Sequence, residues 1–228
     1  MKKLIYLLMF GLIGILSIDS CKKENTEKKA TPTPNNNPTD SLAGKDTVIE
    51  ISTTFGTMYM WLYKQTPLHR NNFCKLTDSG FFNYTTFHRI VPNFVIQGGD
   101  PNSKDGDSTN DGSGGPGYTI PAEFRDSLRH VRGAVGAARL PDSVNPLKAS
   151  SGSQFYICMT TAQTAQLNGN YTVFGFIMKG MDVADMIAKQ PRNTTTNRPF
   201  TDISMQVKII YKTLDQIKTE YNFTPPVF

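Results

Sequence analysis

Apolar and polar residues alternate in two neighbouring runs of the chain, residues 48–53 and 57–63, which are separated by the segment Thr54-Phe55-Gly56. In the second run, every other position from Met58 to Leu62 is apolar. Side chains two residues apart point to the same face of a strand. The pattern therefore predicts a β-hairpin that has one face on a hydrophobic core.

A helix is expected next, over residues 67–78. Thr66 followed by Pro67 has the form of an N-cap and a first helical turn, and Gly80 is typical of the position after a helix end. One face of such a helix would be apolar. The residues of this stripe are Leu68, Phe73 and Leu76.

Four further stretches have the composition of short strands, and one more has that of a helix. The helix is expected over residues 182–188, because Pro191 ends the helical pattern. Many short strands with two isolated helices are typical of a mostly β protein whose antiparallel sheet closes into a barrel. The four additional strands are expected at residues 133–138, 154–160, 171–177 and 205–212.

The N-terminal residues have the pattern of a secretory signal, in which Lys2 and Lys3 precede an apolar run over residues 4–18. Cys21 follows, and the junction before it resembles the site at which bacterial lipoproteins are cleaved and lipidated, although Asp19 departs from that pattern. We expect residues 1–20 to be a signal peptide, and Cys21 to carry a lipid that anchors the exported protein to the membrane of the bacterial cell envelope. An ordinary signal peptide and an uncleaved anchor are the alternatives.

Residues 21–46 are expected to form a disordered tether, because almost no aliphatic residues occur there. One folded domain is expected over residues 47–212, since a chain of 228 residues with 38% hydrophobic residues supplies one sizeable core. Residues 213–228 are expected to be a C-terminal extension. A short helix over 213–221 is expected within it, because Thr213 and Gln216 have the spacing of a capping box.

The net charge of +5 comes mostly from the N-terminal end, where Lys2, Lys3 and four lysines between residues 22 and 29 are concentrated. This distribution favours a membrane-facing leader over a nucleic-acid surface. The three cysteines contain no C-x-x-C pair, and the three histidines lack the spacing of metal ligands. We therefore expect no nucleic-acid partner, no metal, no disulfide, and a monomer.

A Gly-rich loop over residues 100–117 contains two motifs that resemble ligand sites. Residues 112–117 fit G-x-G-x-x-G, but they do not follow a strand and open a helix, as a dinucleotide site requires. The segment that begins at Asp107 resembles a calcium loop, but its twelfth position is Tyr118 rather than glutamate. We interpret the segment as a solvated loop beside a groove and expect no cofactor.

Residues 87–100 read FHRIVPNFVIQGGD and place a cation and an amide in an apolar run. Burying Arg89 or Gln97 costs several kcal/mol unless each finds a partner, so we expect the two side chains to meet. This stretch resembles the signature of the cyclophilin family of peptidyl-prolyl isomerases. Further stretches resemble cyclophilin segments in the family's order, at residues 112–117, 133–139, 152–158 and 167–175.

The resemblance implies a closed eight-stranded antiparallel β-barrel capped by two α-helices, and isomerisation of X-Pro bonds in proline-containing polypeptides. The export expected from the N-terminal signal would make these polypeptides proteins of the envelope. It implies that Arg89 donates to the proline nitrogen and that Gln97 orients Arg89. It also implies that residues 138–139 hold the segment preceding proline through their backbone. The implied catalytic residues are Arg89, Gln97 and Phe94, and the implied substrate-binding residues are His88, Val95, Ala138, Arg139, Gln154, Tyr156, Leu167 and Tyr171.

Two functions of different class fit these residues. An isomerase uses a desolvated cation at the proline nitrogen, whereas a chaperone or scaffold module that only holds proline segments has no need of one. The pair of Arg89 and Gln97 therefore favours the isomerase. A Ser-His-Asp hydrolase has no comparable support, because the chain contains no G-x-S-x-G motif. The loop over residues 139–151 is longer than the usual cyclophilin connection, and we expect it to alter one wall of the cleft.

Overall fold

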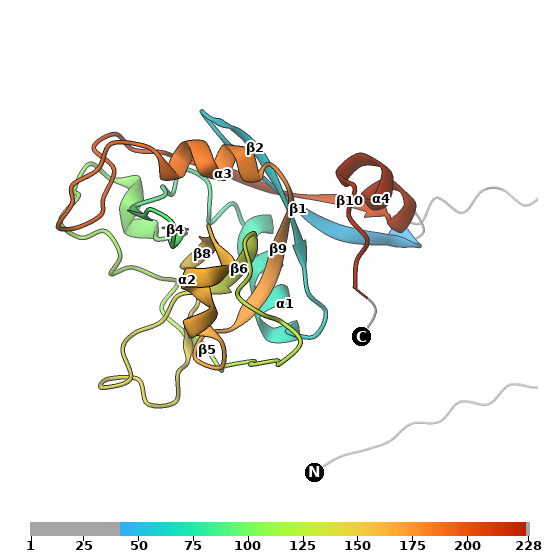
Figure 1. The fold of residues 1–228 in the computed structure, drawn as a ribbon, viewed down its shortest axis with the longest axis horizontal. Coiled ribbons are helices and arrows are strands. Elements are labelled where there is room, and N and C mark those ends of the chain that lie inside the picture. Colours follow the sequence, from blue (N-terminus) through green and yellow to red (C-terminus); the bar gives the residue numbers. More distant parts are fainter. Residues whose placement is uncertain (1–41, 227–228) are drawn as a thin grey trace, which may run out of the picture. The chain divides into compact units, whose positions relative to one another are not determined.

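The computed structural model describes residues 42–226 (Figure 1). Eight strands form one antiparallel sheet in the order β10-β1-β2-β9-β6-β8-β4-β3. These strands are β1 (Lys45–Thr53), β2 (Gly56–Leu62), β3 (Arg89–Val91), β4 (Val95–Gly98), β6 (Ala134–Ala137), β8 (Phe155–Cys158), β9 (Val173–Lys179) and β10 (Gln206–Thr213). A separate pair consists of β5 (Thr119–Ile120) and β7 (Ser150–Ser151).

The helices connect and flank these strands. They are α1 (Pro67–Asp78), η2 (Pro101–Lys104), α2 (Thr161–Thr164), η3 (Ala165–Leu167), α3 (Met181–Ala188) and α4 (Leu214–Tyr221). Between residues 42 and 226, no helix is long and apolar enough to cross a membrane. The expected signal peptide, Cys21 and most of the expected tether lie outside the described residues.

The hairpin predicted from the alternation is present as β1 and β2, with Ile51 opposite Met58. β1 begins at Lys45 rather than at residue 48, because Lys45 and Asp46 already pair with the end of β10. The four other predicted strands are β6, β8, β9 and β10, and their ends differ from the prediction by one or two residues.

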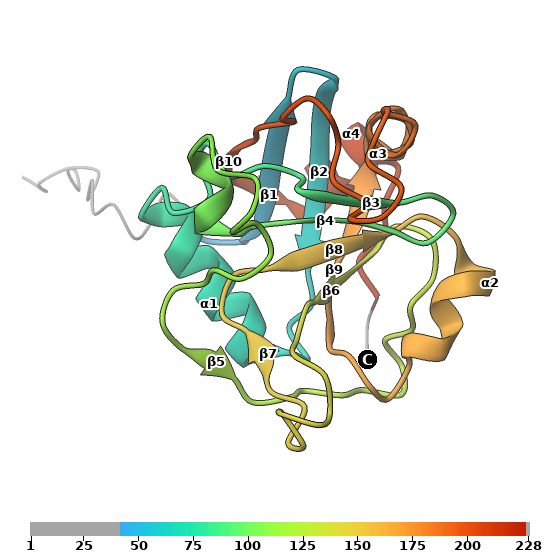
Figure 2. The same ribbon diagram turned by 90° about the vertical axis from the view of Figure 1, so that its left-hand side faces the viewer.

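The expected closed barrel is present only in part, because β3 and β10 are the two ends of the sheet and do not pair along their length within the described residues. The segments before these strands do meet. Thr86 and Ser204 form an isolated antiparallel bridge, and the Phe87 amide donates to the Ile203 carbonyl at 2.9 Å. Figure 2 shows β1 and β2 crossing the direction of β4 and β8, as in a sheet that bends around its core.

α1 covers the predicted residues, but its N-terminus is capped in another way. The Thr66 side chain makes no capping hydrogen bond. The buried carboxylate of Glu123 accepts instead, from the amides of Leu68 at 3.2 Å and His69 at 3.0 Å, and from His69 Nδ1 at 2.7 Å. Phe73 and Leu76 of the expected apolar stripe are buried, but Leu68 is half exposed. His69, the next residue, is buried in its place.

The C-terminal end of α1 is a Schellman motif around Gly80, whose φ is +71°. The Gly80 amide donates to the Thr77 carbonyl at 3.0 Å, and the Phe81 amide donates to the Leu76 carbonyl at 2.9 Å. The backbone must adopt a left-handed conformation at this position, and glycine adopts it without strain. The predicted stop at Gly80 is confirmed. α3 begins at Met181, one residue before the prediction.

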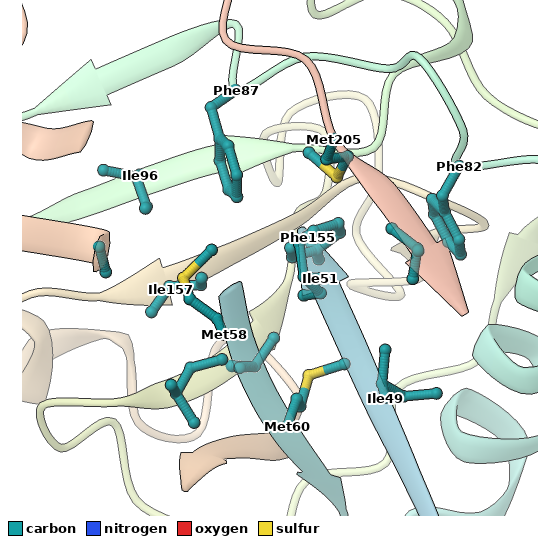
Figure 3. Packing of buried hydrophobic residues seen from close by; sticks show 14 of the residues in the cluster. Ile49, Ile51, Met58, Met60, Phe82, Phe87, Ile96, Phe155, Ile157 and Met205 are labelled. Atoms are coloured by element: carbon teal, nitrogen blue, oxygen red, sulfur yellow. The ribbon is translucent and has the colours of Figure 1, made fainter. Parts of the chain in front are cut away.

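The main core lies on one face of the sheet, where strands β1, β2 and β8 meet the aromatic residues of α1 and its following loop (Figure 3). Phe73 of α1 stacks on Phe82 with ring centroids 4.5 Å apart. Cys74 and Cys158 are both free, so they form no disulfide with each other. The side chains labelled in Figure 3 include Ile49, Ile51, Met58, Met60, Phe155 and Ile157, all nearly or fully buried.

The C-terminal helix α4 covers the opposite face of β1 and β2. Its capping box is formed by Thr213 and Gln216, and Ile217 on its inner face is fully buried. Ile217 packs in a second apolar cluster with Trp61, while the ring of Tyr221 stacks on Tyr59 at 4.9 Å. This contact explains why Trp61, on the polar side of the strand alternation, is only 4% exposed.

We predict that Ile217→Ala destabilises the protein by about 2 to 5 kcal/mol, because it leaves a cavity between α4 and the sheet. Urea unfolding followed through Trp61, the single tryptophan, measures this directly. Leu214→Ala on the exposed side of the same helix is the control, and we expect a change within about 0.5 kcal/mol. Equal effects of the two substitutions would show that α4 contributes no buried contact.

Candidate active site

A groove of about 880 Å³ opens beside β3, β4 and β8. Of the eleven residues expected to act on or bind a substrate, all but Gln154 line it. Gln154 lies directly behind the lining and is nearly buried. The ten lining residues are His88, Arg89, Phe94, Val95, Gln97, Ala138, Arg139, Tyr156, Leu167 and Tyr171.

The pairing register of three strands places the polar floor of the groove. Arg89 of β3 is opposite Gln97 of β4, and Gln97 is opposite Tyr156 of β8. Arg89 Nη1 donates to Gln97 Oε1 at 3.2 Å, so the two side chains meet as expected from the sequence. Gln97 Nε2 in turn donates to Gln154 Oε1 at 3.0 Å.

This hydrogen-bond chain continues into the Gly-rich loop. Gln154 Nε2 donates to the carbonyls of Gly112 at 3.0 Å and Gly114 at 2.8 Å. The amides of the same two glycines donate to the fully buried carboxylate of Asp100. The loop therefore braces Gln154, Gln154 orients Gln97, and Gln97 orients Arg89.

Arg89 is half-buried, and this desolvation lowers the pKa of its guanidinium. Arg89 remains charged despite this burial, because a guanidinium loses a proton only at extreme pH. Removal of water strengthens the electrostatic effect of the charge on nearby groups. The groove floor thus holds a fixed cation with N–H donors.

The apolar part of the groove lies next to this cation. Val95 and Tyr156 belong to a small apolar cluster against which Phe94 and Leu167 pack. The Tyr156 hydroxyl points away from the groove, to His130 Nε2 at 2.8 Å, and Tyr156 is only 4% exposed.

The hydrogen-bond directions around His130 follow from one backbone amide. The His130 amide can only donate, and it donates to Asn168 Oδ1 at 2.9 Å. His130 Nδ1 lies 2.9 Å from the same oxygen and must therefore donate too. In a neutral imidazole Nε2 is then an acceptor, so the Tyr156 hydroxyl donates to it. Burial lowers the pKa of His130, which favours this neutral form.

One wall of the groove is built by Arg139 and Tyr171. The guanidinium of Arg139 lies 4.5 Å from the centre of the Tyr171 ring, and its Nε donates to the Asn170 carbonyl at 2.7 Å. The backbone of Ala138, expected to hold a substrate, already makes two bonds inside the protein. Its amide donates to the backbone carbonyl of Gln154 at 3.0 Å, and its carbonyl accepts from the backbone amide of Ser151 at 2.7 Å.

His88 precedes Arg89 in the chain and also lines the groove. Burial lowers the pKa of its imidazole. The wall beyond it combines the Gly-rich loop, which was expected beside a groove, with residues 193–200, which were not. Arg198 pairs there with Asp111 at 2.5 Å and with Asp202 at 2.9 Å. The Ile90 amide of β3 donates to the Asn197 carbonyl at 2.7 Å, which attaches this wall to the floor. The lining residues of this wall are Ser108, Thr109, Asp111 and Gly112 of the Gly-rich loop, together with Asn193, Thr196, Arg198, Pro199 and Phe200.

A site of this kind binds a compact apolar ring and presents fixed N–H donors to atoms at the edge of that ring. Such donors stabilise a transition state that develops a lone pair or negative charge where the ground state has none. Stabilisation of this kind requires no covalent intermediate. It fits a reaction that changes the conformation of a bound group.

The family model for cyclophilin type peptidyl-prolyl cis-trans isomerase/CLD matches residues 48–209, which include all the strands from β2 to β9 and both sides of the groove. The chain belongs to the cyclophilin family. It is a peptidyl-prolyl cis-trans isomerase.

Similar proteins come from distant organisms. This cyclophilin is 34% identical to a peptidyl-prolyl cis-trans isomerase of Acinetobacter baylyi, over 72% of this chain and 87% of that protein. It is 35% identical to the peptidyl-prolyl cis-trans isomerase-like 1 of Neurospora crassa, over 70% of this chain and 91% of that protein. The fold resembles a Cryptosporidium parvum cyclophilin solved in the presence of the dipeptide Ala-Pro, with a TM-score of 0.61, 28% identity, and coverage of 72% of this chain and 98% of that one.

In this cyclophilin we predict that stability falls as the pH drops below about 6.5, the ordinary pKa of histidine. Because burial lowers the pKa of His130, the unfolded chain binds a proton in a pH range where the folded chain does not. Stability is thus present above the unfolded pKa and is lost as the pH falls through the folded one. Burial lowers the pKa of His69 and His88 as well, so they act in the same direction.

Urea unfolding at pH 7.5 and pH 5.5 measures this loss. We expect His130→Gln, which cannot titrate, to lose less stability between the two pH values than the natural protein, by at most about 1.4 kcal/mol per pH unit. Tyr156→Phe keeps the histidine but leaves its Nε2 without a donor, so we expect it to cost about 1 to 3 kcal/mol at pH 7.5. An identical pH dependence in the natural protein and His130→Gln would contradict the assignment of a neutral His130.

Proposed function

We propose that this isomerase acts on X-Pro bonds in proteins of the cell envelope and that Arg89 supplies the catalytic hydrogen bond. The observation that supports the proposal is the chain from Arg89 through Gln97 to Gln154, which lies beside an apolar pocket. The proline ring occupies the pocket of Phe94, Val95, Tyr156 and Leu167.

The chemistry needs only a donor in the right place. Resonance in the X-Pro amide sets a rotation barrier of about 18 to 20 kcal/mol, although the cis and trans forms differ by only about 0.5 to 1 kcal/mol. In the twisted transition state resonance is lost and the nitrogen becomes pyramidal, with a lone pair that accepts a hydrogen bond. A guanidinium aimed at that nitrogen binds the twisted form better than the planar one and lowers the barrier.

Gln97 holds Arg89 in position in this mechanism and is itself held by Gln154. Its carbonyl oxygen holds Arg89, while the hydrogen bond from its amide nitrogen to Gln154 fixes the orientation of the amide. A pre-oriented donor loses less conformational entropy when the transition state forms. His88, Ala138, Arg139 and Tyr171 shape the groove on either side of the proline.

We predict that Arg89→Ala lowers kcat/KM about 100-fold or more while the fold is retained, because about 1.4 kcal/mol of transition-state stabilisation is lost for each factor of ten. A protease-coupled assay on an Ala-Pro-Phe peptide measures kcat/KM, and circular dichroism monitors the fold. Arg129→Ala, at an exposed arginine outside the groove, is the control. Near-natural activity of a folded Arg89→Ala protein would sink the proposed role.

We also propose that the protein is exported and held at the membrane by a lipid on Cys21. The support is the sequence alone: Lys2 and Lys3, the apolar run over residues 4–18, and the cysteine that follows it. A lipid anchor would place the isomerase beside proteins that fold outside the cytoplasm, which is the basis for proposing envelope substrates.

We predict that Cys21→Ser abolishes partition of the protein into the detergent phase, because the thiol that accepts the lipid is lost. Phase separation of cell extracts, followed by immunoblotting, measures this. Cys74→Ser is the matched control, since Cys74 lies in α1 of the folded domain. If the natural protein remains wholly in the aqueous phase, the anchor is ruled out, whatever the isomerase assay shows.

A further inference from the structure

The loop between β6 and β7 carries three exposed aliphatic side chains. Leu140, Val144 and Leu147 are 63%, 68% and 85% exposed. The loop projects at the lower left in Figure 1 and at the bottom in Figure 2. We refer to these three side chains as the apolar loop surface. Single exposed aliphatic residues are common, but three on one short projecting loop are not.

The conformation of this loop is fixed by its polar groups. The Asn145 side chain donates to the Ala149 carbonyl at 2.8 Å and accepts from the Ala149 amide at 3.1 Å. The Asn145 backbone amide donates to the Pro141 carbonyl, and the Asn145 backbone carbonyl accepts from the Lys148 amide, both at 3.0 Å. These hydrogen bonds join polar groups within the loop, while the aliphatic side chains lie outside it. The surface is therefore held ready before any partner arrives.

The loop that carries the apolar loop surface begins at the groove. Arg139 lines the groove, and Leu140 is the next residue along the chain. An extended polypeptide advances about 3.3 Å per residue, so a few residues beyond the proline suffice to carry a bound chain past Arg139 onto the loop. A bound segment longer than the pocket can therefore extend from the groove onto this loop.

We propose that the apolar loop surface binds an aliphatic segment of the same unfolded polypeptide whose proline lies in the groove. The inference rests on the proposed function of the groove and extends it from the X-Pro bond to the neighbouring sequence. Folded proteins bury their aliphatic segments, whereas unfolded chains expose them. The loop thus favours unfolded substrates over proline segments on the surface of folded proteins.

A lipid surface fits the loop less well. Peripheral membrane contacts combine apolar side chains with cations that are free to meet anionic headgroups. Both cations of this loop are already occupied. Arg139 pairs with Asp142 at 2.5 Å, and Lys148 Nζ donates to Asn170 Oδ1 at 2.5 Å.

A second copy of the chain also fits less well. A stable protein–protein interface buries about 800 Å² on each partner and involves about 20 to 30 residues on each side. Three side chains on a projecting loop provide only a small part of that area. A peptide segment of a few residues matches the size of the surface.

The proposal is tested with a triple variant, Leu140→Ser, Val144→Ser and Leu147→Ser, in the full chain. The matched control carries serine at Leu68, Met186 and Leu214, which are exposed by 50%, 40% and 55% at other places. Each protein is assayed on the Ala-Pro-Phe peptide and on an unfolded protein whose refolding is limited by proline isomerisation. We expect the triple variant to keep its kcat/KM on the peptide within about twofold and to lose about tenfold on the protein.

A second measurement uses only the natural protein and does not depend on whether the variant folds. A peptide with a central Ala-Pro bond is extended, at each end in turn, by a segment rich in leucine and valine or by a serine segment of equal length. We expect the aliphatic extension to raise kcat/KM over the serine extension at one end. Equal values at both ends would overturn the proposal.

Two further results would overturn the proposal. One is equal catalysis of protein refolding by the triple variant and the control. The other is loss of self-association or of vesicle binding in the triple variant with refolding catalysis unchanged, which would assign the surface to a second copy or to a lipid. Failure of the proposed groove is a separate outcome, because natural protein without activity on the Ala-Pro-Phe peptide would reveal it directly.

Discussion

The site depends on keeping one guanidinium oriented at the edge of an apolar pocket. Arg89 is held by Gln97, Gln97 by Gln154, and Gln154 by two glycine carbonyls. That loop is itself held by the buried carboxylate of Asp100. Each partly buried polar group would be costly without its partner, so the chain of bonds is favoured only when it is complete. This constraint ties a surface loop to the guanidinium of Arg89.

The sheet serves the core and the groove with alternate residues of the same strands. Arg89, Gln97 and Tyr156 face the groove, while Ile90, Ile96 and Ile157 are fully buried in the core. A slip of one residue in any of these strands would exchange the two sets. The free energy of burying the isoleucines therefore also fixes the register that aligns the polar floor, and stability and geometry have the same origin.

The parts that could be predicted from the sequence are those that depend on neighbours along the chain. Alternation in residues 57–63 gave the hairpin, and the unusual cation in an apolar run gave the contact of Arg89 with Gln97. The cap of α1 by Glu123 and the bond from Tyr156 to His130 join residues far apart in the sequence. Nothing in the local pattern of Glu123 or His130 distinguishes them from surface residues, so only the folded structure reveals these partners.

The strands beneath the groove and the loops that form its walls are held by different kinds of contact. The strands that carry Arg89 and Gln97 are joined by a ladder of backbone hydrogen bonds, which a change of an exposed side chain in a wall does not alter. The walls are loops attached by side chains, as in the pairs of Arg198 with Asp111 and of Arg139 with Asp142. A wall can thus gain or lose an exposed apolar side chain, such as Phe200, while Arg89 stays in place. Differences among related isomerases in the sequences they favour are expected to lie in these loops.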